Sequence, residues 1–225
     1  MIVAFDLDDT LYPEETFVRS GFRAVAHTLQ ERFAVSEADA LDVMWDSLER
    51  RGRGTQFDDV VDALGLRGRQ SVRELIKVYR HHRPSISLPQ ESSVTLKQLQ
   101  PRPLYVVTDG HKIVQQNKID ALGIAPSLRH AYITHRYGVH NRKPSTYVFE
   151  LMMRRERCRP RDVVYIGDDP TKDFRALRPL GVRTVRVRTG RHSGVEVPAS
   201  EDAELAVESI LEVPNVISEM ETTTA

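Results

Sequence analysis

MIVAFDLDDTL, residues 1–11, begins with five apolar residues and continues directly into a loop rich in acids. A short apolar run that ends abruptly in carboxylates predicts a buried strand opening into a polar loop. In an open α/β sheet, ligands bind just outside the carboxyl ends of the strands. Asp6 and Asp8, one residue apart at such an end, therefore have the chemistry to act on one substrate, Asp6 as a nucleophile and Asp8 as a proton donor and acceptor. A polar turn that only caps the strand is the alternative interpretation, because such turns are often rich in Asp.

After residue 84, apolar runs alternate with helical patterns. Further strands are predicted where these runs are compact or alternate, at residues 104–108, 131–134, 163–166 and 184–187. The last of them alternates as an edge strand does. Gly123 and Gly181 end two of the helices between the strands. This order predicts an α/β fold with a Rossmann-like parallel sheet and helices on both faces.

Residues 13–83 have a different pattern, with four successive helical stripes and no strand between them. Pro13 suits the first turn of a helix, and Ser36 and Thr55, each followed by Asp three residues later, resemble N-terminal caps of two others. We therefore expect a helical domain at 13–83, inserted into an α/β core domain of residues 1–12 and 84–225. The tail 221–225 is expected to fray.

The composition excludes several classes of partner. Basic and acidic residues number 32 each, so the formal net charge is +0 and no nucleic-acid polymer or anionic membrane is predicted as a partner. No apolar stretch approaches the ~20 residues that span a bilayer. The single Cys158 forms no internal disulfide, and the short apolar start is not a signal peptide. A soluble cytoplasmic protein is expected, and its oligomeric state is not predicted.

Four strand ends or loops offer polar groups to one crevice. They carry Asp6, Asp8 and Thr10; Thr108; Lys143; and Asp168, Asp169 and Asp173. Carboxylates from two loops suit Mg²⁺, which takes oxygen ligands and commonly also substrate phosphate. A hydroxyl and backbone N–H groups at a helix start suit phosphate oxygens, and a lysine balances the charge of a phosphoryl group. Each feature alone has a structural explanation, such as a helix N-cap for the Asp cluster.

The order and character of these motifs resemble the haloacid dehalogenase-like hydrolase superfamily. The resemblance covers the whole α/β part and rests on the loop from Asp6 to Leu11, the strand end at Thr108, the pair Lys143-Pro144, and the loop from Gly167 to Asp173. The helical insertion looks like the small C1-type cap of that superfamily.

The resemblance implies a phosphatase that acts on a small phosphorylated metabolite, either a sugar phosphate or a nucleoside monophosphate, with Mg²⁺ as cofactor. Asp6 would form an aspartyl-phosphate and Asp8 would transfer the protons, while Asp6, the Asp8 carbonyl, Asp168 and Asp173 would hold the metal. Thr108 and Lys143 complete the implied catalytic set, and Thr10, Asp109 and Gly110 the substrate-binding loops.

Two departures from the family pattern matter. Asp109 stands where relatives often carry Asn, and its carboxylate would repel phosphate unless it points away. Asp169 competes with Asp168 for the metal role, and we favour Asp168 because it directly follows Gly167. Lys172 is a second candidate for the lysine role.

Other activities remain open on the same fold. In the related dehalogenases the residue that matches Asp8 is not an acid, so Asp8 favours a phosphatase over a 2-haloacid dehalogenase. A phosphomutase keeps both acids and is excluded less firmly. A catalytically silent binding module is the non-enzymatic alternative, and the complete acidic set argues against it.

Overall fold

The computed structural model describes the backbone of residues 1–223, which forms two compact units. One contains Met1–Glu14 and the chain from Ser87 onward, and we call it the sheet unit. The other contains Glu15–Ile86, and we call it the helical unit.

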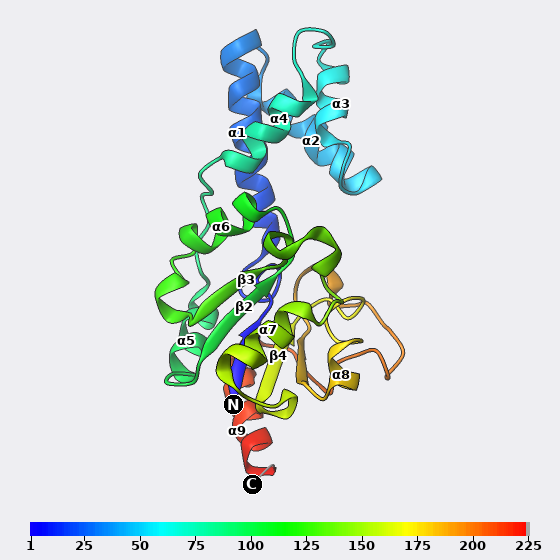
Figure 1. Ribbon diagram of the computed structural model, residues 1–225. Helices are drawn as coiled ribbons and strands as arrows, with labels where there is room; N and C mark the ends of the chain where they lie inside the picture. Colours follow the sequence, from blue (N-terminus) through cyan, green and yellow to red (C-terminus); the bar gives the residue numbers. More distant parts are fainter. Residues whose placement is uncertain (224–225) are drawn as a thin grey trace. The chain divides into compact units, whose positions relative to one another are not determined.

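A six-stranded sheet forms the centre of the sheet unit (Figure 1). Its strands are β1 (Ile2–Phe5), β2 (Leu104–Thr108), β3 (His130–Ile133), β4 (Val163–Gly167), β5 (Arg183–Val187) and β6 (Leu205–Val207). All neighbours are parallel, in the order β3-β2-β1-β4-β5-β6. Phe5 pairs with Val106 on one side and with Ile166 on the other, so the residues that follow β1, β2 and β4 meet at one edge. The predicted Rossmann-like α/β fold is confirmed.

The sheet contains one strand more than the sequence predicts. β6 pairs with β5, with Val207 opposite Val187, so the prediction that residues 184–187 form an edge strand is wrong. β6 escapes prediction because it has only three residues, of which Leu205 and Ala206 are exposed. β3 also begins and ends one residue earlier than predicted, and Thr134 starts a short 3₁₀ helix.

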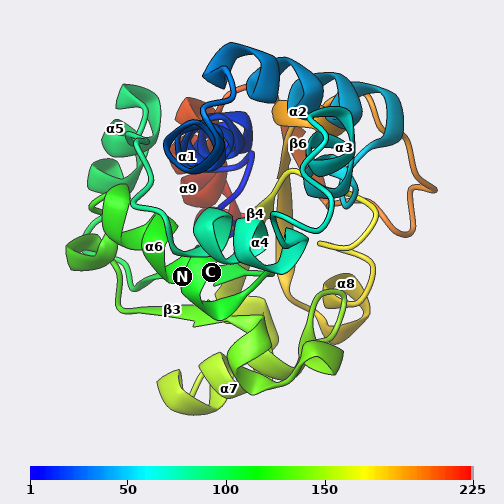
Figure 2. The same cartoon turned by 90° about the horizontal axis from the view of Figure 1, so that it is seen from above.

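Helices cover both faces of the sheet. They are α5 (Gln90–Gln98), α6 (Lys112–Ala121), α7 (Tyr147–Glu156), α8 (Leu177–Leu180) and α9 (Val213–Thr223). Short 3₁₀ helices lie at Ala125–Ser127, Thr134–Tyr137, Val139–Asn141, Pro160–Asp162, Gly190–His192 and Ile210–Glu212. Viewed from above, α7 and α8 lie on one side of the sheet, and α5 and α9 on the other (Figure 2). The left-handed Gly123 and Gly181 end α6 and α8, as predicted.

The core under α7 and α8 is apolar and continuous. Phe149 and Met152 of α7 pack with Leu177 of α8 against alternate residues of the strands, such as Ala4 and Tyr165. Alternate side chains of a strand point to opposite faces, and both faces of this sheet are covered, which explains why the central strands read as unbroken apolar runs.

The helical unit consists of α1 (Glu14–Phe33, whose first residue belongs to the sheet unit), α2 (Glu37–Arg51), α3 (Gln56–Ala63) and α4 (Val72–His81). Their predicted stripes meet in one cluster, in which Phe22, Val25 and Leu29 of α1 are buried with Met44 and Leu75. Gly21 is needed for this packing, because a Cβ on it would come 2.3 Å from the Tyr79 ring.

The structure tests the predicted helix caps and the predicted fraying of the C-terminal tail. Ser36 accepts a hydrogen bond from the Asp39 N–H and caps α2 as predicted. Thr55 occupies the N-cap position of α3 as predicted, but its side chain makes no capping hydrogen bond. The tail does not fray at its start, because α9 continues to Thr223 and Glu221 binds Arg102. Thr224 and Ala225 lie outside the described residues.

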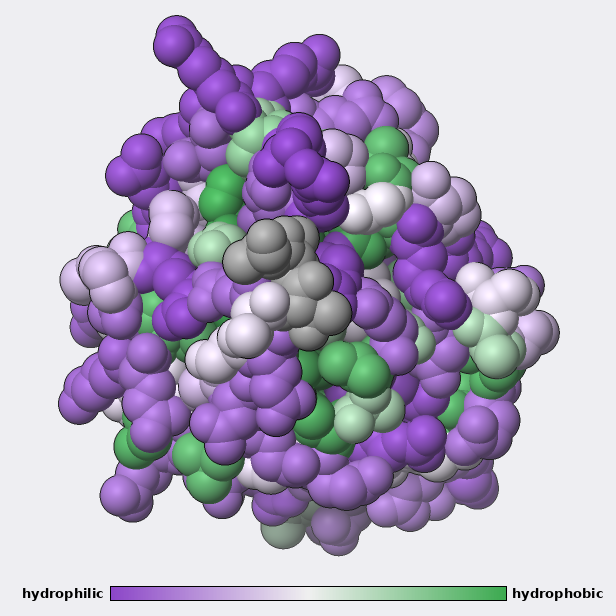
Figure 3. All heavy atoms as spheres, turned by 90° about the horizontal axis from the view of Figure 1, so that it is seen from below, coloured by the Kyte–Doolittle hydropathy of each residue, from purple (hydrophilic) through white to green (hydrophobic). Residues whose placement is uncertain are grey.

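One face of the molecule is mainly hydrophilic, with its hydrophobic residues in small separate patches (Figure 3). Such scattered apolar residues are usual on protein surfaces. Among the described residues, no helix combines the length and the hydropathy needed to span a bilayer.

Candidate active site

Asp6 lies at the carboxyl end of β1, only 3% exposed. Its Oδ1 accepts a hydrogen bond from the Leu7 N–H at 2.8 Å, and its Oδ2 lies 2.9 Å from Nζ of Lys143. Burial raises the pKa of Asp6 and the Asp173 carboxylate adds to the rise, while the charge of Lys143 opposes it. The nearby ammonium therefore favours the ionised form that a nucleophile needs.

Lys143 reaches this point from the loop before α7. Its Nζ lies 2.7 Å from Asp173 Oδ1 and donates to the Tyr165 hydroxyl at 2.9 Å. Burial alone would lower the pKa of Lys143, but the Asp173 and Asp6 carboxylates outweigh it and hold the pKa well above its ordinary value. The side chain is a fixed positive charge beside Asp6.

Asp6, Asp168 and Asp173 form the acidic cluster of the site. One oxygen from each lies within 4.8 Å of the others, and all three residues are buried. Burial, together with the charges of Asp6 and Asp173, raises the pKa of Asp168 to about 8. Gly167 is required beside them, because a Cβ there would come 2.5 Å from Asp173 Oδ2.

Two further side chains fix the Asp168 carboxylate. Thr10 donates to its Oδ1 at 3.2 Å, and Nδ1 of His192 lies 2.9 Å from its Oδ2. Thr10, expected among the substrate-binding residues, is thus placed against Asp168 and is 5% exposed.

Asp169 and Lys172, the two alternatives of the sequence analysis, pair with each other beside the acidic cluster. The Asp169 N–H donates to Asp173 Oδ2 at 3.1 Å. Burial opposes the charged form of Lys172, but the charges of Asp6 and Asp173 raise its pKa above the ordinary value. Asp169 accepts hydrogen bonds from the backbone N–H and the hydroxyl of Thr171, and its Oδ2 lies 3.2 Å from Lys172 Nζ. These contacts close the turn that follows β4. The acidic cluster among the described residues contains Asp168 in its place.

Asp8 is held apart from the acidic cluster. Its Oδ1 accepts from the Tyr12 hydroxyl and from Lys118 Nζ, each at 2.7 Å, and its Oδ2 accepts from Gln115 Nε2 at 2.9 Å. Tyr12 follows in the same loop, while Gln115 and Lys118 belong to α6. The side chain therefore has a defined position beside the strand end.

The end of β2 supplies Thr108, Asp109 and Gly110. Gln115 Nε2 donates to the Thr108 hydroxyl oxygen at 2.5 Å, which directs the hydroxyl proton away from α6. Oδ1 of Asp109 accepts from the Thr134 hydroxyl at 2.7 Å and from the Lys143 N–H at 3.1 Å. Gly110 has φ +135°, a conformation that favours glycine.

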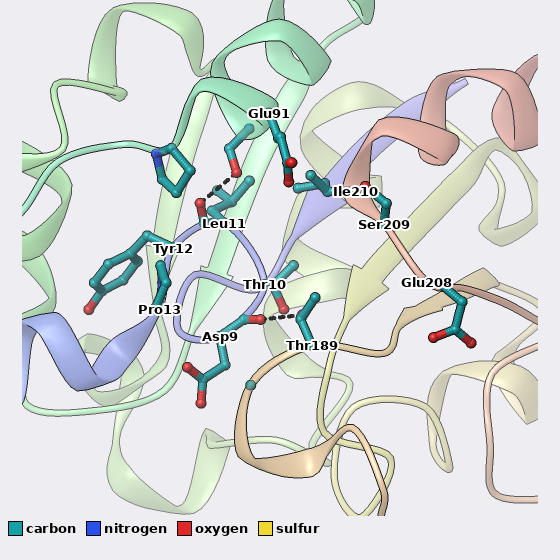
Figure 4. A pocket seen from close by; sticks show the side chains of 13 residues that line it. Asp9, Thr10, Leu11, Tyr12, Pro13, Glu91, Thr189, Glu208, Ser209 and Ile210 are labelled. Atoms are coloured by element: carbon teal, nitrogen blue, oxygen red, sulfur yellow. Dashed lines mark hydrogen bonds between the residues drawn. The ribbon is translucent and has the colours of Figure 1, made fainter.

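A pocket of about 170 Å³ lies between the loop after β1, the start of α5 and the loop after β5 (Figure 4). Two hydrogen bonds anchor the loop after β1 at this pocket. Ser92 of α5 donates to the Leu11 carbonyl at 2.7 Å, and Thr189 donates to the Asp9 carbonyl at 2.6 Å. Asp9 adopts a positive φ of 56°, and its carboxylate accepts from the Glu14 N–H at the start of α1. Asp9 is thus a turn and cap residue.

Comparison with known proteins identifies the family. A model described as haloacid dehalogenase-like hydrolase matches residues 3–187. The chain belongs to the haloacid dehalogenase-like hydrolases.

This hydrolase is similar to two archaeal proteins over most of its length. Glyceraldehyde 3-phosphate phosphatase of Methanocaldococcus jannaschii is 28% identical over 225 residues, which covers 97% of both chains. The protein of the same name from Methanopyrus kandleri is 28% identical over 209 residues, 89% of this chain and 88% of the relative. The crystal structure of 2-haloacid dehalogenase from Pseudomonas syringae superposes with a TM-score of 0.67 at 22% identity, covering 97% of this chain and 99% of that one. That likeness shows a shared fold.

The structure adds residues that the sequence analysis of this haloacid dehalogenase-like hydrolase missed. They are Tyr12, Gln115, Lys118, Tyr165 and His192, each in contact with a predicted site residue. In α6, the apolar Ile113 and Val114 are partly exposed, whereas the polar Gln115 and Lys118 are buried. Gln115 and Lys118, three residues apart, share one face of the helix, but the sequence does not mark that face as buried, because polar side chains at this spacing also occur on solvated faces.

Proposed function

We propose that this protein is a Mg²⁺-dependent phosphatase that hydrolyses a small phosphate monoester through an aspartyl-phosphate on Asp6. The observation that carries the proposal is the position of Asp6, buried at the end of β1, 2.9 Å from Lys143 and within the carboxylate cluster of Asp168 and Asp173. A nucleophile for an anionic phosphate needs such nearby positive charge, because two unshielded anions repel strongly.

The chemistry of the acidic cluster fits Mg²⁺. This ion prefers carboxylate oxygens and retains positions for water and substrate phosphate. Asp6, Asp168 and Asp173 would hold it, with the backbone carbonyl of Asp8. Burial and the neighbouring charges of Asp6 and Asp173 raise the pKa of Asp168, and a bound cation would relieve the repulsion among the three carboxylates. When bound, Mg²⁺ would polarise the phosphoryl oxygens and neutralise part of their charge.

The first chemical step forms a bond between an Asp6 oxygen and phosphorus and breaks the bond between phosphorus and the ester oxygen. Protonated Asp8 gives its proton to that leaving oxygen, so that a neutral alcohol departs. Asp8, now a carboxylate, then takes a proton from the water that attacks phosphorus. The Asp6–phosphorus bond breaks, and inorganic phosphate and both acids are restored.

The phosphoryl oxygens would be held by Thr108, the backbone near Gly110, and Lys143. The Thr108 hydroxyl oxygen accepts from Gln115, so its own proton is directed to another acceptor. Asp109 keeps its Oδ1 on Thr134 and on the Lys143 backbone, so in our proposal it braces the loop and does not contact phosphate. Uncatalysed phosphate monoester hydrolysis is so slow that enzymes accelerate it by up to ~10²¹-fold, mainly by positioning and charge neutralisation.

Glyceraldehyde 3-phosphate is the first substrate to test, because the two archaeal relatives that match most of this chain carry its name. Sugar phosphates and nucleoside monophosphates complete the panel. We expect the helical unit, residues 15–86, to act as the cap that selects the leaving group.

The test is the release of inorganic phosphate from these esters and from p-nitrophenyl phosphate, with Mg²⁺ and with excess EDTA. We expect activity with Mg²⁺ only, and a loss of at least ~10⁴-fold in Asp6→Asn. Asp9→Asn is the matched control, because Asn tolerates a positive φ and keeps an acceptor for the Glu14 N–H. Equal activity of wild type and Asp6→Asn would reject the nucleophile, and turnover of a 2-haloacid without any phosphatase activity would favour a dehalogenase.

A further inference from the structure

Lys118 is a buried charge for which the reaction outlined above has no role. Its side chain is 2% exposed, and its Nζ lies 2.7 Å from Asp8 Oδ1 and 3.3 Å from Glu14 Oε1. A buried ammonium is costly unless it is paired and hydrogen-bonded. Two carboxylates meet this requirement, and Glu14 also lies 3.3 Å from Nη1 of Arg191. The position of Lys118 is therefore fixed by its partners.

The same helix supplies a second donor to Asp8. Gln115 lies three residues before Lys118, on the same face of α6, and donates to Asp8 Oδ2 at 2.9 Å. Among the described residues, Oδ1 of Asp8 has two donors, Tyr12 and Lys118, whereas Oδ2 has Gln115 alone. A lone pair of Oδ2 thus remains for a proton.

We propose that Lys118, assisted by Gln115, is a positioning residue that aims the Asp8 carboxyl at the leaving-group oxygen. This inference rests on the proposed function, since it concerns the proton that Asp8 gives to the departing alcohol. A misplacement of about 1 Å in a reacting group can cost about 10²-fold in rate, so a carboxyl anchored at both oxygens has a large kinetic advantage. Because Gln115 also holds Thr108, one face of α6 orients both the proton donor and a proposed phosphate ligand.

A positioning role predicts an effect that depends on the leaving group. The oxygen of an alkyl ester departs as a strong base and needs the proton from Asp8, whereas p-nitrophenolate is a good leaving group without it. Loss of Lys118 should therefore slow alkyl esters far more than p-nitrophenyl phosphate. A general disturbance of the fold would slow both esters alike.

The experiment compares kcat/KM for the best alkyl phosphate and for p-nitrophenyl phosphate in wild type and in Lys118→Met. The quantity kcat/KM reports the transfer of the phosphoryl group to Asp6 and is independent of the later hydrolysis. We expect a loss of about 10²-fold for the alkyl ester and of less than about 10-fold for the aryl ester. In an Asp8→Asn background, Lys118→Met should change neither rate by more than about 3-fold, because the group it positions is gone.

Lys118→Met leaves Asp8 and Glu14 without their shared cation, so folding is checked by circular dichroism and thermal unfolding. The double variant Lys118→Met/Glu14→Gln removes one charge of each sign, and it should show the same preference for the aryl ester. Lys112→Met, an exposed lysine of the same helix, is the matched control and should behave as wild type.

Equal losses on both esters in Lys118→Met and in the double variant, or no loss in either, would overturn the positioning role while leaving the phosphatase intact. A wild type that hydrolyses neither ester would instead reject the proposed function, and with it this inference.

Discussion

Nζ of Lys143 lies 2.9 Å from Oδ2 of Asp6, and both side chains are almost completely buried. The pair joins the end of β1 to the loop before α7, two segments far apart in the sequence. Lys143 also lies 2.7 Å from Asp173, so one cation is shared by two carboxylates. A fixed positive charge at this point lowers the electrostatic barrier to an attack by Asp6 on an anionic phosphate.

Lys143→Met should lower kcat/KM for any phosphate ester by about 10²–10³-fold, because the charge beside Asp6 is lost. Lys172→Met should lower it by less than about 10-fold, since the ion pair of Lys172 is with Asp169, and its charge acts on Asp6 and Asp173 without such a pair. Steady-state kinetics of the two variants provide the comparison. A larger loss in Lys172→Met would assign the lysine role to Lys172 instead.

Asp109→Asn should keep kcat/KM within about 3-fold of wild type. The amide oxygen of Asn can accept the hydrogen bonds from Thr134 and from the Lys143 N–H that Oδ1 of Asp109 now accepts. Asp109→Leu lacks this acceptor and should lose about 10-fold or more, because the Lys143 loop is released. Similar kinetics for the Asn and Leu variants would mean that these two bonds do not position Lys143.

The sheet and the positions of the acids could be predicted because each depends on a local pattern. Unbroken apolar runs predict buried parallel strands. Parallel strands bring their carboxyl ends to one edge of the sheet, and Asp6, Thr108 and Asp168 all lie at this edge. β6 could not be predicted in this way, since a three-residue strand with two exposed members has no such pattern.

The contacts that tune the site were not predictable, because they join segments remote in sequence. The direction of the Asp109 carboxylate depends on Thr134, and the orientation of the Asp168 carboxylate depends on Thr10 and His192. From the sequence alone, Lys118 resembles an ordinary surface lysine of an amphipathic helix. Its contact with Asp8 becomes evident only in the folded structure.

Mg²⁺ should raise the thermal unfolding temperature of the protein, because it binds the folded acidic cluster and relieves its repulsion. At a concentration 100-fold above Kd the stabilisation is about 2.7 kcal/mol, or several degrees. Differential scanning calorimetry measures this shift. Asp168→Asn should abolish most of it and Asp169→Asn should retain it, and the reverse result would move the metal site to Asp169.

Because of Glu221, the stability of the sheet unit should depend on pH under acidic conditions. Hydrogen bonds from Arg102, together with the N-terminal ammonium 2.7 Å from Glu221 Oε1, lower the pKa of Glu221 to about 2, from an ordinary 4.5. A group whose folded-state pKa is depressed stabilises the protein above its unfolded pKa, and this contribution is lost as the pH falls from about 4.5 to about 2. The carboxyl is partly solvated, so we expect about 1 kcal/mol.

Glu221→Gln therefore should be less stable than wild type at pH 7, and the difference should shrink toward zero near pH 2. Urea unfolding at a series of pH values measures it. A difference that is constant with pH would show that the ion pairs of Glu221 with Arg102 and the N-terminal ammonium are not its source.

The most direct measurement of the central claim is chemical trapping of the intermediate during turnover. Borohydride reduces an acyl phosphate but leaves free carboxylates unchanged, and peptide mass mapping then locates the modified residue. We predict that the peptide containing Asp6 is modified at Asp6 alone, only when phosphate ester and Mg²⁺ are both present, and that Asp6→Asn gives no such product. Active enzyme that shows no modification under these conditions, or modification at Asp8 in place of Asp6, would contradict the account.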